Sequence, residues 1–416
     1  MPVFIEPVEK SPRRNRKSTQ PESETGFSDE ALLLTDAPVP GRALEQVARR
    51  QEDAHLYVES LSRIEELEAL AQEWQELADD SAEPNAFYEP WMLLPALKHF
   101  QSNKAEVLVA YAPHPSNAKG KRLLCGLFPI VQRRGRVEAF RHRYCYLSAP
   151  LLRRGYERAA LKVFLDTMAS RAQVVRLEDV PGEGPLRRHL VDELNGRGWP
   201  CVVSACYTRA VLKRASSAED YLASAVPPKR RKEWRRQRAR LCEQGAVGTF
   251  EVPKGDDPRG FVAELCELEA AGWKGKKGVD AKRDQAFLEE LAVNAAREGR
   301  QQLLALRIDG RPLALKWNLL SGDAAFAFKI TFDESFARFS PGVQLELDNV
   351  ERAHLLPRLR FMDSCAAPNR FMINHLWPDR REMQTLFFGT GRALGALTVA
   401  TVPLIHLARR LFRRTP

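Results

Sequence analysis

The chain has 416 residues, of which 44% are hydrophobic and 28% charged, and this is the composition of an ordinary globular protein of two or three domains. Its formal net charge of +10 favours acidic partners such as the phosphates of CoA, nucleic acid or anionic lipid. The 7 cysteines are scattered and form no C-x-x-C pair, which argues against a disulfide framework or a zinc site and fits a reducing compartment, and we expect no bound metal.

Residues 1–54 are polar and rich in proline without sustained periodicity, which predicts a disordered tail. Prolines and charges in MPVFIEPVEKSPRRNRKSTQ interrupt any apolar signal-peptide core, so we expect a cytoplasmic protein. A first lobe is predicted over 55–215. Its expected elements are a strand at 55–60, helices at 62–78 and 91–100, strands at 105–112, 122–134 and 144–149, a helix at 156–169, a strand at 174–180, a helix at 186–197 and a strand at 206–214.

The second half repeats this order over 216–390, after a predicted linker within 213–229. Residues 391–416 are expected to form a basic amphipathic C-terminal helix. The order predicts an α/β (α+β type) fold of two tandem lobes, each a mixed, mostly antiparallel sheet flanked by helices. The expected elements of the second lobe are a strand at 247–253, helices at 259–272 and 284–298, strands at 301–309, 312–321 and 324–332, a helix at 341–354 and a strand at 358–365.

Four stretches indicate a family more specifically than the order of the elements does: LCEQG, AGWKGKKG, AFKITFDESFARFSPGVQLELD and LWPDRRE. With them the chain resembles the bacterial GNAT-superfamily acetyltransferases of the cellulose-biosynthesis CelD-like family. Its tandem lobes are also similar to the Fem-type aminoacyl transferases, which use aminoacyl-tRNA donors. The resemblance implies two GNAT-like lobes and transfer of an acyl group from acetyl-CoA or another acyl-CoA to an amine or hydroxyl, with polysaccharide or cell-envelope biosynthesis as the setting.

The donor site is expected on the strand at 324–332. Alternation places Ala325, Ala327, Lys329 and Thr331 on one face of this strand. This face is small enough for a thioester arm to lie against the backbone, and an exposed strand amide would polarise the thioester carbonyl. Lys329 would neutralise a phosphate or an acceptor carboxylate, although a lysine with its stem along apolar surface is the alternative.

The donor phosphates are expected at the start of the following helix. Ser340 is the predicted N-cap and Pro341 the first helical residue, so the amides of Gly342 and Val343 would point outward toward a pyrophosphate. GNAT enzymes carry R/Q-x-x-G-x-G/A at this place, whereas this chain has RFSPGVQ. An ordinary capped helix start is therefore the alternative.

Asp333 and Glu334 follow the strand and are the candidates for taking a proton from the attacking amine or hydroxyl, with a solvated turn as the alternative. In the glycine-rich stretch AGWKGKKGVD, Trp273 and Lys274 are candidates for a substrate-binding loop, and a plain surface loop is the alternative. Asp363, at the end of a predicted strand, is a further candidate for substrate binding.

Direct attack in a ternary complex is expected, because no histidine partner can be assigned to Cys365 as a nucleophile. The run PPKRRKEWRRQRAR holds eight basic residues and one acid. It is either a solvated basic face or a contact for the phosphates of CoA or tRNA. A Fem-like transferase using aminoacyl-tRNA is therefore the alternative enzyme, and other nucleic acids are not expected.

Residues 393–408 carry no charged side chain, and Arg409, Arg410, Arg413 and Arg414 follow them. This uncharged run is too short to span a bilayer. It predicts either an interfacial helix held on an anionic membrane surface, as in a peripheral protein, or a terminal helix docked on the second lobe. A non-catalytic, membrane-associated accessory protein of polysaccharide assembly is the third alternative for function.

Overall fold

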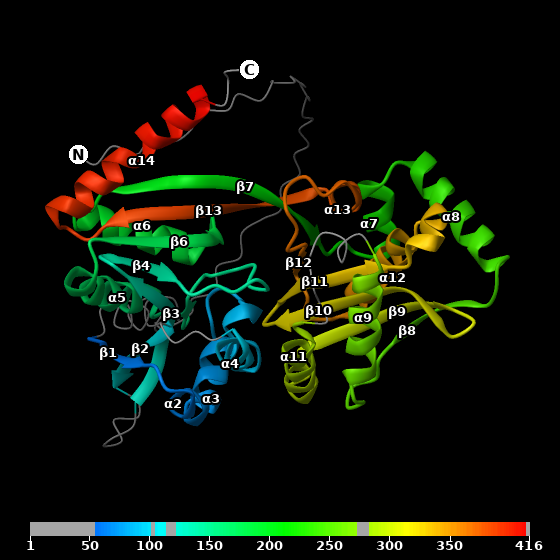
Figure 1. Cartoon of the computed structure of the whole chain (residues 1–416), viewed down its shortest axis with the longest axis horizontal. Helices are drawn as coiled ribbons and strands as arrows, with labels where there is room; N and C mark the ends of the chain where they lie inside the picture. The colour runs from blue at the N-terminus through cyan, green and yellow to red at the C-terminus, as the bar shows by residue number, and fades with distance from the viewer. Residues whose placement is uncertain (1–54, 101–104, 114–121, 273–282, 413–416) are drawn as a thin grey trace, which may run out of the picture.

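Figure 1 shows the computed structural model of the chain, which describes residues 55–100, 105–113, 122–272 and 283–412. The first lobe contains β1 (Tyr57–Leu61), α2 (Ile64–Ala69), α3 (Ala71–Asp79), the 3₁₀ helix η1 (Ala86–Tyr88), α4 (Pro90–His99), β2 (Ala105–Pro113), β3 (Arg122–Arg133), β4 (Arg136–Ala139), β5 (Leu151–Leu152), α5 (Glu157–Arg171), β6 (Val174–Pro181), α6 (Pro185–Gly196) and β7 (Cys201–Lys213).

The second lobe and the C-terminal region contain α7 (Ala218–Ala225), α8 (Pro228–Cys242), β8 (Val247–Glu251), α9 (Arg259–Ala271), α11 (Gln285–Arg297), β9 (Gln301–Ile308), β10 (Arg311–Ser321), β11 (Ala324–Phe332), the 3₁₀ helix η2 (Glu334–Phe339), α12 (Pro341–Leu355), β12 (Phe361–Asp363), α13 (Phe371–Leu376), β13 (Asp379–Gly389) and α14 (Ala393–Phe412).

One sheet runs through both lobes, in the order β1-β2-β3-β4-β6-β13-β7-β12-β11-β10-β9-β8. Each lobe contributes an antiparallel meander and one parallel pair, β4 with β6 and β11 with β12. In each parallel pair a helix connects the strands, α5 in the first lobe and α12 in the second. The predicted fold class, two tandem lobes with mixed and mostly antiparallel pairing, is confirmed.

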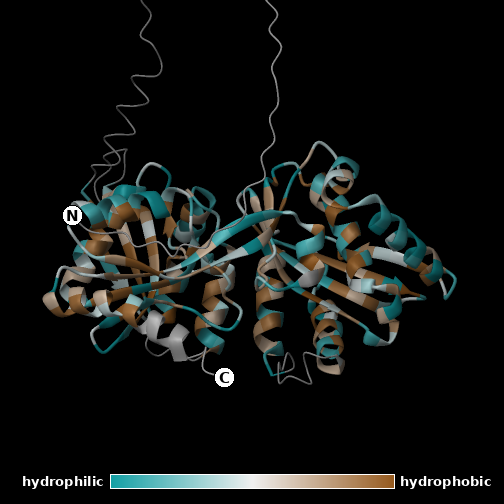
Figure 2. Ribbon diagram, turned by 90° about the horizontal axis from the view of Figure 1, so that it is seen from above, coloured by the Kyte–Doolittle hydropathy of each residue, from teal (hydrophilic) through white to brown (hydrophobic). Residues whose placement is uncertain are grey.

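The lobes exchange strands at their junction. The end of β7 pairs with β12 of the second lobe, over Val211–Lys213. β13, which follows the second lobe in sequence, runs back and pairs with β6 and β7 of the first lobe. Figures 1 and 2 show β7 and β13 as the band that joins the two halves. The second half of the chain therefore completes the sheet of the first half.

The hydrophobic core is also shared between the lobes. Phe87 of η1 packs against Phe326 of β11 with ring centroids 5.5 Å apart, and Phe100 after α4 packs against Phe287 of α11 at 4.8 Å. Figure 2 shows apolar strands inside both lobes and polar outer faces on the helices. The two lobes are consequently packed together by side chains as well as joined by strands.

One local prediction is wrong. Residues 144–149 form no strand but belong to the connection between β4 and β5, and all of them except the half-buried Tyr146 are buried. The predicted linker holds α7, which Ser217 caps by accepting a hydrogen bond from the amide of Asp220 and which Tyr221 anchors in the core.

Candidate active site

The strand β12 ends beside the segment of β11 that is predicted to hold the donor. β11 pairs with β10 along its length, but its ladder with β12 joins only Ala324–Phe326 to Phe361–Asp363. β12 itself ends at Asp363, whereas β11 continues to Phe332, so β11 has no β12 residue opposite it from the half-buried Ala327 onward. The backbone of β11 beyond this point is therefore not paired with β12.

A β-bulge in β11 changes which of its side chains share a face. Lys329 and Ala327 lie opposite adjacent residues of β10, so Phe328 is the extra residue. Phe328 and Lys329 consequently both face Tyr144 of the first lobe. The Tyr144 ring centroid lies 5.9 Å from that of Phe328 and 5.0 Å from Nζ of Lys329.

The predicted alternation is therefore wrong for the second half of β11. The bulge shifts the pattern by one residue, so that Lys329 and Thr331 lie on the opposite face from Ala325 and Ala327. Thr331 opposes Leu315, whose side chain belongs to the core shared with α9 and α11. Both Lys329 and Thr331 are buried.

Lys329 forms a buried ion pair with Glu269 of α9. Its Nζ lies 2.6 Å from Oε2 of Glu269, and the two side chains are 6% and 1% exposed. An ammonium that is paired and buried in this way cannot serve as a freely placed cation for a ligand phosphate. The pair instead fixes α9 to the bulged part of β11.

The first lobe contributes two tyrosines to this region. The Tyr144 hydroxyl donates a hydrogen bond to Oδ2 of Asp284 at 2.8 Å. Asp284 lies immediately before α11. The ring of Tyr146 lies 6.3 Å from that of Phe328. Burial raises the pKa of Tyr146, and the nearby Cys365 and Glu269 raise it further. The Tyr146 hydroxyl therefore stays protonated at neutral pH and can act as a proton donor.

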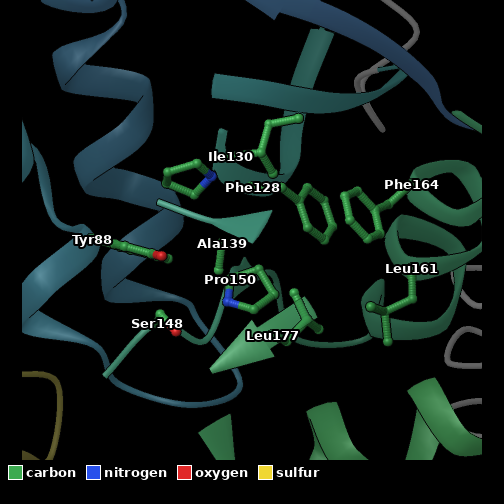
Figure 3. Close-up of a pocket in the computed structure, with 10 residues that line it drawn as sticks. Tyr88, Phe128, Ile130, Ala139, Ser148, Pro150, Leu161, Phe164 and Leu177 are labelled. Atoms are coloured by element: carbon green, nitrogen blue, oxygen red, sulfur yellow. The ribbon is translucent and has the colours of Figure 1, made fainter. Parts of the chain in front are cut away.

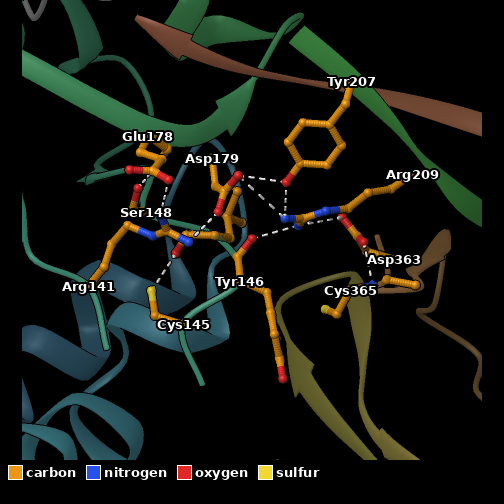
Figure 4. Close-up of polar contacts among 12 residues, drawn as sticks. Arg141, Cys145, Tyr146, Ser148, Glu178, Asp179, Tyr207, Arg209, Asp363 and Cys365 are labelled. Carbon is orange, nitrogen blue, oxygen red and sulfur yellow. Dashed lines mark hydrogen bonds and ion pairs between the residues drawn. The ribbon is translucent and has the colours of Figure 1, made fainter. Parts of the chain in front are cut away.

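A polar cluster at the lobe junction holds the backbone of Tyr146. Arg209 donates to the carbonyl of Tyr146 at 2.5 Å and to the hydroxyl of Tyr207 at 2.5 Å. Tyr207 in turn donates to Asp179 at 2.6 Å, and Arg141 donates to the other oxygen of that carboxylate. Figure 4 shows the side chain of Tyr146 extending away from this cluster. The cluster therefore holds Tyr146 through its backbone carbonyl and makes no contact with its hydroxyl.

Asp363 belongs to the same cluster. It is fully buried, accepts a hydrogen bond from the amide of Cys365 at 2.8 Å, and lies 3.3 Å from Arg381. Both Asp179 and Cys365 have left-handed backbone angles, with φ of 50° and 51°. Strained backbone at two residues of one cluster indicates that the surrounding contacts over-determine its geometry. Asp363 accordingly has a buried, paired carboxylate at this junction.

The two carboxylates after β11 differ in environment. Asp333 accepts hydrogen bonds from the amide and hydroxyl of Ser335, at 2.9 and 2.6 Å, and pairs with Arg311. Burial alone would raise the pKa of Asp333, but these bonds outweigh it and the pKa is lowered. Glu334 is exposed, and its Oε1 lies 3.2 Å from the position that a Cβ on Gly272 would take. Glu334 thus lies beside the end of α9.

The predicted loop residues Trp273 and Lys274 lie outside the described residues, directly after Gly272. Glu334 is therefore adjacent to the point where this loop begins.

The start of α12 differs from the expected anion site. Ser340 has φ 53° and its side chain makes no capping hydrogen bond. Its carbonyl instead accepts from the amides of Val343 and Gln344, at 2.9 and 3.0 Å. The Val343 amide therefore does not point outward, because the carbonyl of Ser340 closes the first turn on it.

Gly342 is buried under two side chains. A Cβ added there would lie 3.3 Å from Phe332 Cδ1 and 3.7 Å from Met372 Sδ. A ligand can reach the Gly342 amide only if these side chains move.

The basic helix α8 packs beside the start of α12. The carbonyl of Trp234 accepts a hydrogen bond from Gln344 at 3.0 Å, and Arg238 lies 3.5 Å from Asp348. The exposed basic residues of α8 are Lys229, Lys232, Arg235, Arg236 and Arg240. Positive charge is thus concentrated beside the N-terminus of α12.

The first lobe has the corresponding strand arrangement, but apolar side chains fill it. The parallel ladder of β4 with β6 ends at Arg176, although β6 continues to Pro181. Figure 3 shows the small apolar pocket at this place, where the rings of Phe128 and Phe164 stack 4.4 Å apart. The polar arm of an acyl carrier would have fewer polar groups around it there than beside β11. The second lobe is therefore the better candidate for the site of the reaction.

Comparison with known proteins agrees with this geometry. Residues 228–371 match the family model of the acetyltransferase (GNAT) domain. A conserved protein of unknown function from Bacteroides thetaiotaomicron matches at 10% identity over 77% of this chain and 97% of that chain, with a TM-score of 0.50. FemX matches at 9% identity over 76% of this chain and 95% of that chain, with a TM-score of 0.52. No curated protein matches the chain by sequence.

The chain therefore has a GNAT-like fold and carries a GNAT-type acetyltransferase domain in its second half. At such low identities, the likeness to the two solved structures shows the fold alone. In the part of the chain that the structure describes, no group of three or more His, Cys, Asp and Glu residues is arranged to hold a metal ion.

Sequence reasoning missed Tyr144, Tyr146 and Glu269. The two tyrosines lie in the predicted strand at 144–149 of the other lobe, and Glu269 is one of several acids on a helix with an apolar face. The packing of the lobes brings the two tyrosines to β11, and the packing of α9 on β11 within the second lobe brings Glu269 there. The nearest available signal was the stretch YCYLSAPLLRRG, which contains both tyrosines.

Proposed function

We propose that this protein is an acyltransferase that moves an acyl group from acyl-CoA, such as acetyl-CoA, to an amine or hydroxyl acceptor. The observation that carries the proposal is that β11 extends past the end of β12 beside Tyr146 and the Lys329–Glu269 pair, within a domain of GNAT type. The pantetheine arm of CoA contains amide groups, and such an arm can pair with a strand edge as a peptide does.

The reaction would take place where β11 extends past the end of β12. A β11 amide near Ala327 would donate to the thioester carbonyl and stabilise the developing oxyanion. The acceptor nitrogen or oxygen attacks this carbonyl, its bond to carbon forms, and the bond between carbon and the CoA sulfur breaks. Tyr146 would give its proton to the departing thiolate, since its hydroxyl is protonated at neutral pH.

Glu334 would take the proton from the attacking group, directly or through water. Its exposure beside Gly272 gives an acceptor access to it. Asp333 suits this role less well, because its hydrogen bonds lower its pKa and make it a weaker base. Lys329 and Asp363 would position the neighbouring elements, and the buried Thr331 would support the strand.

Direct transfer in a ternary complex is favoured over a covalent intermediate. Cys365 lies in the cluster of Figure 4 and is one of the groups that raise the pKa of Tyr146. Burial raises its thiol pKa well above the ordinary value, and Asp363 raises it further. A thiol held protonated in this way is a poor nucleophile.

The donor phosphates would lie between the start of α12 and the exposed basic face of α8. Ser340, Gly342 and Val343 would line this region, with Phe332 and Met372 moving aside from Gly342. The positive helix terminus and the charge of α8 both favour anions there. The resemblance to CelD-like proteins suggests an acceptor in polysaccharide or cell-envelope biosynthesis.

Calorimetric titration of the full chain with acetyl-CoA tests this proposal. We expect binding that Gly342→Trp abolishes, because the indole would occupy the start of α12. Gly260→Trp is the matched control, since a Cβ at Gly260 of α9 meets nothing within 4 Å. Thermal unfolding of both variants separates loss of the site from loss of the fold. Absence of acetyl-CoA binding by the folded wild-type protein would contradict the proposal.

A Fem-like transferase is the second candidate, and the exposed basic residues of α8 are the observation that favours it. Its donor would be an aminoacyl-tRNA. Binding of charged tRNA that is lost on replacing Lys229, Lys232 and Arg235 by Gln would support this candidate. A protein that binds neither donor would be a non-catalytic scaffold, and the cover over Gly342 is the feature that fits this third possibility.

A further inference from the structure

The C-terminal helix α14 is apolar on two opposite faces, and one of them is covered. It packs on β13, β7 and β6 of the first lobe. Val399 and Val402 join Val174 and Phe387 in a small core beneath it. Gly395 lies so close to the sheet connection that an added Cβ would approach the carbonyl oxygen of Gln173 to 2.1 Å. The inner face is thus fixed to the protein.

The outer face of α14 carries exposed leucines. Leu394, Leu397 and Leu404 are 55%, 62% and 64% exposed, and they are three of the six large hydrophobic side chains that are exposed in the described part of the chain. At about 100° per residue these leucines fall within an arc of about 80°, opposite Gly395 and Val399. A helix that is apolar all round is normally covered on all sides.

The hydroxyl groups on this helix are satisfied internally. Thr398 donates to the carbonyl of Leu394 at 2.7 Å, and Thr401 donates to that of Thr398 at 2.7 Å. Threonines bonded to their own helix do not need water as a partner. The outer face can therefore enter an apolar medium without leaving these hydroxyls unpaired.

We propose that α14 binds the surface of an anionic lipid bilayer, lying in the plane of the interface with its leucines among the acyl chains. Four arginines, Arg409, Arg410, Arg413 and Arg414, end the helix and the sequence after it, and the chain carries a net charge of +10. This charge attracts anionic headgroups. It also repels a second copy that would pair through the same face, which favours lipid over a dimer.

The geometry agrees with a helix that lies on the bilayer instead of crossing it. Of the helices in the described residues, none has the length and apolar content needed to span a membrane. α14 covers the first lobe, whereas the candidate active site lies at β11 and β12 of the second (Figure 1). Lipid binding through α14 is therefore independent of acyl transfer, and its test needs no activity assay.

Flotation of the full chain with lipid vesicles tests the proposal. The vesicles are phosphatidylcholine with or without about one third phosphatidylglycerol. We expect the protein to float with the anionic vesicles and not with the neutral ones. The triple variant Leu394→Ser, Leu397→Ser and Leu404→Ser should bind at least about tenfold more weakly. Leu355→Ser is the matched control, because Leu355 is 73% exposed on another helix, and it should bind like the wild type.

Thermal unfolding shows whether the triple variant retains the fold. If the triple variant is unfolded, the single variant Leu397→Ser replaces it. This variant should also bind the anionic vesicles more weakly than the wild type. Equal flotation of the wild-type and leucine variants would overturn the proposal. Failure of the wild-type protein to float with anionic vesicles would also overturn the proposal. This holds whether the wild type is monomeric or forms a dimer that the leucine variant dissociates.

Discussion

Lys329 of β11 and Glu269 of α9 form an ion pair that is 2.6 Å long and almost completely buried. The bulge at Phe328 makes this contact possible, because it turns Lys329 toward α9. Breaking a buried pair by removing one partner leaves an uncompensated charge and costs about 3–5 kcal/mol. We expect Lys329→Met to lower the free energy of unfolding by about this amount, measured by urea denaturation.

The double variant Lys329→Met with Glu269→Leu should recover a large part of that loss, since two apolar side chains leave no unpaired charge. Lys98→Met is the control, because Lys98 is 39% exposed beside Glu68 at 2.8 Å. It should cost less than about 1 kcal/mol. Additive losses in the double variant would show that the two groups do not act as a pair.

Tyr146 is expected to affect the rate of transfer more than the binding of the donor. If its hydroxyl protonates the departing thiolate, Tyr146→Phe should lower kcat by about 10²-fold or more and leave the affinity for acyl-CoA nearly unchanged. Steady-state kinetics and calorimetry on the same preparation give the two quantities. Tyr111→Phe is the matched control, since the Tyr111 hydroxyl is buried without a hydrogen-bond partner in the described structure. Parallel changes in kcat and affinity for Tyr146→Phe would argue for a structural role.

Asp333 should make stability depend on pH in a defined direction. Its pKa in the folded protein lies below the ordinary value of 3.8, because Ser335 and Arg311 favour the ionised form more than burial opposes it. The resulting stabilisation is fully present above the unfolded pKa and is lost as the pH falls through the lower folded pKa. We expect Asp333→Asn to destabilise the protein by less than about 1 kcal/mol at neutral pH.

Urea denaturation of wild type and Asp333→Asn between neutral pH and about pH 2 measures this difference. The two curves should converge at the acid end. A difference that grows on acidification would show that the sign of the pKa shift is wrong.

Gly395 should be intolerant of any side chain. A methyl group there would meet the carbonyl oxygen of Gln173 at 2.1 Å, so Gly395→Ala should displace α14 from the sheet. Limited proteolysis should then cut the variant within 393–412 faster than the wild type. At Gly260 of α9 a Cβ meets nothing within 4 Å, and Gly260→Ala should be neutral or stabilise by up to about 1 kcal/mol. Equal protection of α14 in both variants would contradict the close packing.

The sequence was sufficient for most of the elements and for the tandem arrangement, because helical and strand periodicities are local. It did not reveal β13 as a strand of the first lobe. Asp379–Gly389 begins with charges, and its partners β6 and β7 lie far away in sequence. Strand exchange of this kind depends on the packing of two lobes, which no local pattern encodes.

The candidate site could be predicted only in part. The region around Ala327 and Gly342 was identified from strand–helix chemistry and from the family resemblance. The bulge at Phe328 was not, since nothing in AAFAFKITF marks an extra residue. Tyr146 was missed because it reaches β11 from the other lobe, and the cover over Gly342 comes from Phe332 and Met372, whose proximity is tertiary.

Hydrogen exchange of the full chain with and without acetyl-CoA tests whether the donor binds along β11. We expect added protection in the peptide covering Ala324–Phe332 and at the start of α12, with little change in β4 and β6. Protection confined to the first lobe, or no change in β11 at saturating acetyl-CoA, would contradict it.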